Sequence, residues 1–412
     1  MSAGEFIPLT AQQRTHFGWL EDASLNKVIA ALEAVEPGSA KFVGGCVRDA
    51  LFGTAPKDFD VATTLPPDRV VAALKTAGLR SAPTGIEHGT ITAIVDHHGV
   101  EVTTLRADVS TDGRRATVAF TRDWQVDAGR RDFTINAIYL TPDGQLYDPV
   151  AGIADIEAGR VRFIGDATRR IAEDFLRILR FFRFTARFSE RFDEPGLTAC
   201  TAQRGGIARL SAERIGAELM AILALPRAAF ALKAMQDAGV LRAIWDAPAH
   251  IDAVARLKTI APDALAPVVL AVLFGADGTG VGARLRLSNA EKAIRSNTLK
   301  GAEQIVPSLQ DKAVRELIYR LGRDVFLDAA AAAFALERID EAAHARLTGL
   351  AKAWQAPTLS VSGRHIIDAG VPPGVAVAKI LEATEAQWIA EDFPAPSRLI
   401  EILETQIAAL RA

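Results

Sequence analysis

The stretch GGCVRDALFGTAPKDFD, residues 44–60, is the most informative part of the chain. It follows a short β-rich run and opens with two adjacent glycines, Gly44 and Gly45, before a helical pattern over residues 46–52. Glycines between a strand and a helix let backbone N–H groups approach a phosphate, and the N-terminal end of a helix favours negative charge. The stretch therefore predicts a phosphate-binding turn, with Arg48 in the first helical turn to pair with a phosphate oxygen.

Two carboxylates, Asp58 and Asp60, end the same stretch. We expect residues 58–63 to form a strand, which would point both carboxylates to one face and turn Phe59 into the core. Neighbouring carboxylates repel each other, and Mg²⁺ relieves this repulsion because it prefers oxygen ligands, commonly one or two carboxylates plus substrate phosphates. A DxD pair alone is weak evidence, but together with the preceding GG-x-x-RD it predicts a magnesium site.

A third carboxylate suits a two-metal site, in which one ion activates the attacking hydroxyl and the other stabilises the leaving pyrophosphate. The best candidate is Glu101, in a predicted strand where Val100 and Val102 face the other way. The same pattern fits an exposed strand glutamate equally well. Both interpretations stay open at this point.

The segment RRDFTINA, residues 130–137, is a second dense polar cluster. Its guanidinium groups, including that of Arg131, can bind phosphate or ribose oxygens through their fixed fork of donors. Asn136 could hydrogen-bond a sugar hydroxyl. Asp132 could take part in this site or cap a helix that begins after it, and the two roles are compatible.

The segment RRIAEDFLRILRFFRFTARF, residues 169–188, contains six arginines and two acids, against a net charge of −3 for the whole chain. We expect one helix over residues 171–188, with Asp174 and Arg177 on one face and Arg180 and Arg183 on an adjoining band. An ordinary helix with Glu173 and Asp174 paired to Arg177 is the alternative. That alternative leaves the later arginines unpaired, so the segment favours binding of a triphosphate or an RNA backbone.

Composition limits the class of protein. The chain has 412 residues, 49% hydrophobic and 24% charged, enough for two to four compact units. Its net charge of −3 argues against a protein that coats nucleic acid indiscriminately. The two cysteines are too few for a disulfide scaffold. A signal-peptide pattern and an apolar run long enough for a membrane span are both missing, so we expect a cytoplasmic protein without a membrane partner.

Strand and helix patterns alternate over about the first 150 residues, with helices expected over residues 24–35 and 67–77 and a hairpin of strands over residues 90–95 and 99–105. Later segments are nearly all helical, among them residues 211–224 and 227–240, and the whole pattern predicts an α+β fold. The four motifs, in this order and spacing, resemble those of the class II tRNA nucleotidyltransferase and poly(A) polymerase family over about residues 40–225. The resemblance implies a polymerase-β-like head with a mixed sheet and flanking helices, followed by a helical neck, body and tail. The implied domains are residues 1–148 for the nucleotidyltransferase head, 149–225 for the base-recognising neck, and 226–412 for the tRNA-binding body and tail.

The resemblance also implies roles for individual residues. Asp58 and Asp60 would be the Mg²⁺ ligands and, with Glu101, the catalytic carboxylates. Asp174 and Arg177 would hydrogen-bond the Watson–Crick edge of the incoming base, so that protein replaces a template. The full set of implied nucleotide-binding residues is Gly45, Arg48, Arg131, Asp132, Asn136, Asp174, Arg177, Arg180 and Arg183.

The implied function is addition of CCA to the 3′ end of tRNA from CTP and ATP. The tRNA 3′-hydroxyl would attack the α-phosphate and release pyrophosphate, with Mg²⁺ as cofactor, and the sequence indicates no protein partner. Residues 106–129 would form the flexible loop that full CCA-adding enzymes use, although addition of CC or A alone stays open. The alternatives are a poly(A) polymerase, whose relatives usually carry a longer basic C-terminal region, and a non-catalytic RNA-binding protein.

Overall fold

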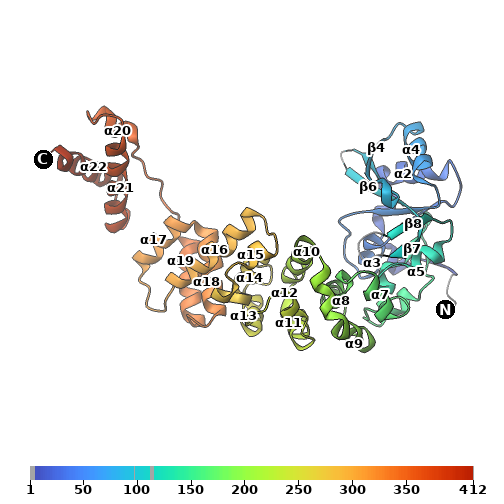
Figure 1. Cartoon of the computed structure of the whole chain (residues 1–412). Helices are drawn as coiled ribbons and strands as arrows, with labels where there is room; N and C mark the ends of the chain where they lie inside the picture. Colours follow the sequence, from blue (N-terminus) through green and yellow to red (C-terminus); the bar gives the residue numbers. More distant parts are fainter. Residues whose placement is uncertain (1–4, 97, 112–115, 412) are drawn as a thin grey trace. The chain divides into compact units, whose positions relative to one another are not determined.

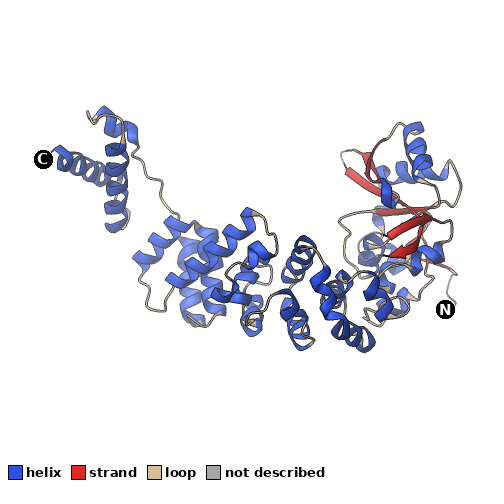
Figure 2. Cartoon of the chain, in the orientation of Figure 1, coloured by secondary structure: helices blue, strands red, loops and turns tan. Residues whose placement is uncertain are grey.

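The computed structural model describes residues 5–96, 98–111 and 116–411 (Figure 1). The chain divides into two compact units, Met1–Asp246 and Ala247–Ala412. All strands of the described residues lie in the first unit, and the second is built from helices (Figure 2). The domain boundaries implied by the resemblance stay predictions.

A mixed sheet of eight strands forms the centre of the first unit, in the order β1-β10-β9-β2-β3-β6-β5-β4. Strands β3 and β6 pair in parallel, which places Asp60 beside Glu101, and β5 and β6 form the antiparallel hairpin expected from the sequence. This arrangement confirms the predicted α+β head. The strands of the sheet are β1 Phe6–Pro8, β2 Ala40–Val43, β3 Asp60–Thr63, β4 Arg80–Gly85, β5 Thr90–Val95, β6 His98–Thr104, β9 Tyr139–Leu140 and β10 Gln145–Tyr147.

Side chains alternate between the two faces of this sheet, as strand geometry requires. Phe42 and Val61 join a large core with the apolar faces of α2 (Ala23–Glu33), α3 (Gly45–Leu51) and α4 (Pro67–Thr76). Val43 and Ala62 point the other way, into a smaller core around Tyr139. The three helices confirm those predicted from the sequence, and Phe59 packs against the large core as expected.

One expectation for the head was wrong in detail, and a second concerns a segment that the structure describes only in part. Strand β3 begins at Asp60 and not at Asp58, because its partner β2 ends where Gly44 turns the chain into α3, and residues 57–58 form a bend. The segment expected as a flexible loop has regular structure in its described part. It forms the paired strands β7 (Arg106–Thr111) and β8 (Ala116–Phe120) and then α5 (Trp124–Gly129), while residues 112–115 lie outside the described residues.

The single helix expected over residues 171–188 is two helices, α7 (Ala167–Glu173) and α8 (Leu176–Phe188). Asp174 has an extended backbone with φ −156° and ψ 107°, and its Oδ1 accepts a hydrogen bond from the Leu176 N–H at 3.1 Å. An aspartate that bonds the backbone two residues ahead competes with the helical pattern, and this explains the break. Asp174 and Arg177 therefore do not lie on one continuous helix.

Two of the remaining helices of the first unit follow the sequence patterns. Those expected over residues 211–224 and 227–240 are present as α10 and α11, and the latter is followed by a separate α12. The bounds are α1 Ala11–Arg14, η1 Gly18–Glu21, η2 Ile86–His88, η3 Thr134–Asn136, α6 Gly152–Glu157, α9 Glu194–Gln203, η4 Arg204–Arg209, α10 Ala212–Leu223, α11 Ala228–Asp237 and α12 Val240–Ile244.

The second unit is a helical assembly whose last helices share a core around Ile366, Trp388 and Leu399. In the described part of the chain, no helix combines the length and the apolar character needed to cross a membrane. Its helices are α13 Ile251–Ile260, α14 Ala266–Phe274, η5 Gly275–Gly278, α15 Val281–Arg284, α16 Asn289–Gln304, α17 Asp311–Leu321, α18 Arg323–Ala335, α19 Glu341–Ala353, α20 Gly363–Asp368, α21 Val375–Ala390 and α22 Pro396–Arg411.

Candidate active site

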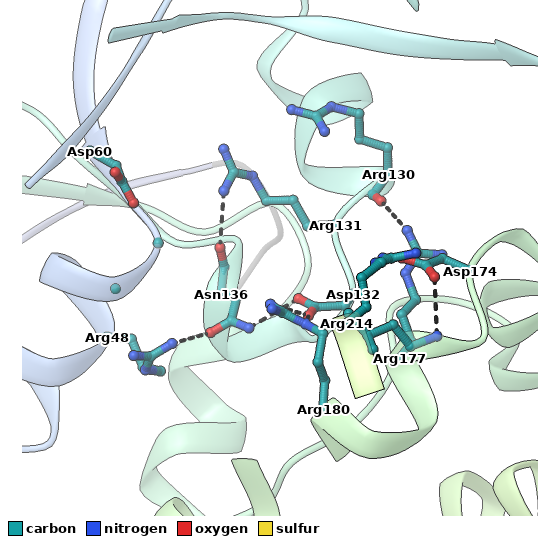
Figure 3. Close-up of a pocket in the computed structure, with 13 residues that line it drawn as sticks. Arg48, Asp60, Arg130, Arg131, Asp132, Asn136, Asp174, Arg177, Arg180 and Arg214 are labelled. Atoms are coloured by element: carbon teal, nitrogen blue, oxygen red, sulfur yellow. Dashed lines mark hydrogen bonds and ion pairs between the residues drawn. The ribbon is translucent and has the colours of Figure 1, made fainter. Parts of the chain in front are cut away.

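A cavity of about 360 Å³ lies in the first unit between the sheet and the helices that follow it. Figure 3 shows Asp60 on its sheet side and Asp174 with Arg177 on its helical side. Most of the residues proposed from the sequence line this cavity, whereas Asp58, Glu101 and Arg183 do not. Its lining consists of Gly44, Gly45, Arg48, Asp60, Arg130, Arg131, Asp132, Asn136, Asp174, Leu176, Arg177, Arg180 and Arg214.

The turn at Gly44 has the geometry that the two glycines predicted. Gly44 has φ 74° and ψ −127°, a conformation that side chains strongly disfavour, and α3 begins at the next residue. A Cβ at Gly44 would come within 3.6 Å of Asp60 Oδ2, so the backbone here lies against the sheet-side carboxylate. The turn therefore brings the strand end, the helix start and Asp60 to one wall of the cavity.

Arg48 is 6% exposed and is held by the protein itself. Its Nε and Nη2 donate to Asp49 Oδ1 at 2.8 and 2.6 Å, and its Nη1 donates to Asn136 Oδ1 at 2.7 Å. Burial lowers the pKa of Arg48 from its ordinary value, and the charge of Asp49 opposes that shift. The guanidinium is thus fixed in place by three hydrogen bonds from within the protein.

Asp132 connects three elements of the site. Its Oδ1 accepts from Asn136 Nδ2 at 3.0 Å, and its Oδ2 accepts from Arg180 Nε at 2.7 Å. Burial favours a higher pKa for Asp132, but the Arg180 charge and the Asn136 hydrogen bond outweigh it and lower that pKa. The helix-capping role suggested from the sequence was wrong, because the 3-10 helix after it begins at Thr134 with Phe133 at the cap position.

Asp127, which the sequence analysis did not single out, holds the two adjacent arginines. It accepts from Arg130 Nη2 at 2.6 Å, Arg131 Nη2 at 3.1 Å and the Tyr139 hydroxyl at 2.7 Å. Burial opposes ionisation, yet the charges of Arg131 and Arg130 lower the pKa of Asp127 to about 2. An acid one helical turn before two arginines is a local signal that could have identified it.

The base-recognition pair predicted from the sequence has partners from several elements. Asp174 Oδ2 accepts from Arg214 Nη2 at 2.6 Å, and Arg214 had no signal in the local sequence pattern. Arg177 Nη1 donates to Glu173 Oε2 at 2.5 Å, and its Nη2 donates to the Arg130 carbonyl at 3.2 Å. The pairing of Glu173 with Arg177 is therefore present, while Asp174 pairs elsewhere.

The arginines expected to be unpaired have acidic partners distant in sequence. Arg183 Nε donates to Glu218 Oε2 at 2.6 Å, and Arg187 Nη2 donates to Asp49 Oδ2 at 2.8 Å. The argument that unpaired arginines mark a phosphate site was wrong for this reason. Arg180 remains at the cavity, paired with Asp132, whereas Arg183 lies outside its lining.

Among the described residues, no ion pair joins Asp58, Asp60 or Glu101 of the sheet side to an arginine. Asp60 and Glu101 are opposite each other in the β3–β6 register, and Val100 and Val102 are buried as expected. Burial, followed by the negative charges of Glu101 and Asp58, raises the pKa of Asp60 to about 6, against an opposing effect of Arg131. Asp58 is exposed and lines a neighbouring hollow with Lys57, so the two aspartates do not share one strand face.

Known proteins resemble this chain over most of its length. Residues 40–162 match the family described as the poly(A) polymerase head domain. The CCA tRNA nucleotidyltransferase 1, mitochondrial, of Mus musculus is 35% identical over 88% of this chain and 85% of its own length. The CCA-adding enzyme of Levilactobacillus brevis is 32% identical over 86% of this chain and 90% of its own.

The fold resembles that of a solved CCA-adding enzyme. The crystal structure of the Bacillus stearothermophilus CCA-adding enzyme in complex with CTP aligns with a TM-score of 0.71, over 95% of this chain and 99% of that one, at 23% identity. The sequence identity to CCA tRNA nucleotidyltransferases replaces the interpretation as a non-catalytic RNA-binding protein by that of an enzyme. Identity of this extent over nearly the whole length of both chains shows that the protein belongs to the family of CCA tRNA nucleotidyltransferases.

Proposed function

We propose that this protein adds C, C and A to the 3′ end of tRNA from CTP and ATP, with Mg²⁺ as its cofactor. The observation that supports this most is the composition of one cavity. It joins Asp60, at the start of the central strand β3, to Asp174 at the break between α7 and α8 and to Arg177 on α8, with arginines between them. Such a cavity can hold a triphosphate and a base at once.

The carboxylates of the sheet side fit a divalent cation. Nucleotidyltransferases of this family are metal-dependent, and Mg²⁺ prefers carboxylate oxygens. Asp60 gains from a nearby cation because burial and two neighbouring acids disfavour its charge. Among the described residues no three His, Cys, Asp or Glu side chains form a ready-made metal site. Asp58 and Asp60 would therefore hold Mg²⁺ only together with substrate phosphates, with Glu101 as a nearby catalytic carboxylate. When bound, metal ions would activate the tRNA 3′-hydroxyl and stabilise the leaving pyrophosphate.

The arginines of the cavity supply the remaining charge stabilisation. Arg48, Arg131 and Arg180 are each held by an acid or an amide, so their charges need little rearrangement as the nucleotide reacts. Preorganised charges of this kind contribute strongly to catalysis when the transition state gains negative charge. Catalysis then consists of positioning and charge neutralisation, without a covalent intermediate.

Asp174 and Arg177 explain how C and A could be selected without a template. A carboxylate accepts from the exocyclic amino group that both bases carry, and a guanidinium donates to the neighbouring ring nitrogen. Uracil and guanine place a carbonyl oxygen where the amino group would be, which the carboxylate repels. In this structure the Asp174 Oδ2 is bonded to Arg214, so binding of a base would compete with that ion pair.

An extension assay tests the proposal. Purified protein is incubated with Mg²⁺ and tRNA that ends at the discriminator base, with CTP and ATP given separately and together. Three added nucleotides that require both substrates, followed by a stop, are the expected result. A long ladder with ATP alone would identify a poly(A) polymerase, and no extension in any mixture would contradict nucleotidyl transfer at this site.

A further inference from the structure

The break between α7 and α8 determines where the proposed base-reading carboxylate lies. Asp174 sits in the break with an extended backbone, and its two oxygens are held by the Leu176 N–H and by Arg214. Arg177 is held separately, by Glu173 and by a backbone carbonyl. The distance between Asp174 and Arg177 therefore depends on what holds the break in place.

The next residue, Phe175, packs outside the cavity lining against the 3-10 helix η4. A Cβ added at Gly206 would be 2.0 Å from Phe175 Cδ1 and 2.4 Å from its Cγ, closer than real Cβ contacts come. Position 206 thus accepts only glycine while the ring stays in place. The Arg209 guanidinium carbon lies 5.2 Å from the ring centroid, within the range of a cation–π contact.

The segment of residues 204–214 contacts both residues of the break, Asp174 and Phe175. Gly206 and Arg209 of η4 lie against the Phe175 ring, and the chain then enters α10, whose N-cap Ser211 accepts from the Arg214 N–H at 3.4 Å. Arg214 reaches back to Asp174 at 2.6 Å. Displacement of the ring would therefore move Asp174 relative to Arg177, and a misplacement of about 1 Å in an active site can cost two orders of magnitude in rate.

We propose that Phe175 and Gly206 are positioning residues for base selection: the ring seated on Gly206 keeps the Asp174 carboxylate in reach of the base that Arg177 also contacts. This inference rests on the proposed function, because it assigns Asp174 to the base. Neither residue lines the cavity, so their effect passes through Asp174.

The test measures kcat/KM for CTP and for UTP on tRNA that lacks its 3′ CCA. Gly206→Ala is expected to lower the CTP-to-UTP ratio about tenfold, since a fraction of an ångström is lost at a hydrogen-bonding pair. The Mg²⁺ concentration for half-maximal rate should stay unchanged, which a general loss of structure would not allow. Gly205→Ala is the matched control, because a Cβ there meets nothing within 4 Å, and its ratio should equal that of the wild type.

A double-mutant cycle separates the ring from other effects of the added methyl group. Phe175→Ala alone should also lower the ratio, and Gly206→Ala should add nothing in that background, because no ring is left to displace. A further loss there, or a wild-type ratio in Gly206→Ala, would overturn the inference. If Gly206→Ala does not fold, Phe175→Ala carries the same expectation without an added atom. A wild-type protein that does not prefer CTP to UTP would contradict the proposed function instead.

Discussion

On the helical side of the cavity each arginine has an acidic partner, whereas on the sheet side Asp60 has two further acids as neighbours. The first arrangement is complete without a ligand, because the charges neutralise one another inside the protein. The second is unfavourable until a cation arrives. The difference shows that folding itself pairs the positive groups of the cavity with acids. The negative groups around Asp60 are neutralised only when a cation binds.

The largest expected effect on activity comes from a substitution on the sheet side of the cavity. Asp60→Asn should reduce nucleotidyl transfer at least about a thousandfold, because it removes a charge placed for the metal ions and the α-phosphate. Single-turnover extension at saturating CTP and Mg²⁺ measures the effect. Asp68→Asn, on the exposed start of α4, is the control and should keep wild-type activity. Normal transfer by Asp60→Asn would remove this residue from the site.

A change on the helical side should alter selectivity more than the metal requirement. Asp174→Ala is expected to lower the preference for CTP over GTP about a hundredfold, because a site that hydrogen-bonds a substrate group rejects analogues that lack it. Competition between the two nucleotides in the extension assay measures the preference. An unchanged preference with a higher Mg²⁺ requirement would place Asp174 with the metal ions instead.

The paired acids should contribute to stability, with a defined pH dependence. Asp127→Asn should lower the free energy of unfolding by about 2 kcal/mol at pH 7, the order expected from its depressed pKa. Because the folded pKa lies below the unfolded one, this contribution is present above about pH 4 and is lost as the pH falls through about 2. Thermal unfolding of both proteins at pH 7 and pH 3 would show it, and a difference that does not shrink in acid would contradict the ion-pair origin.

The smallest expected effect is a gain in stability against unfolding when Mg²⁺ binds. Mg²⁺ at ten times its dissociation constant should stabilise the wild-type protein by about 1.4 kcal/mol, because a ligand that binds only the folded state stabilises it by mass action. Asp60→Asn should lose this gain, while Asp127→Asn should keep it. Thermal unfolding with and without Mg²⁺ makes the comparison, and an equal gain in all three proteins would locate the cation elsewhere.

Local patterns predicted most of the framework. The two glycines predicted the turn at Gly44, the apolar periodicity predicted α2, α3 and α4, and alternation predicted the β5–β6 hairpin. These features depend on neighbours within a few residues, whose spacing a sequence displays directly. The break at Asp174 was missed because helical periodicity continues through it, while one side-chain hydrogen bond to Leu176 ends the helix.

The sequence by itself determined the family, the α+β head and which residue types the site would contain. Only the tertiary structure decided their pairing: Asp49 meets Arg187 across 138 positions, and Asp174 meets Arg214 across 40. It likewise placed Gly206 under the Phe175 ring. The physical reason is that contacts between distant segments follow from how whole helices pack. The local sequence around one partner therefore does not indicate the other.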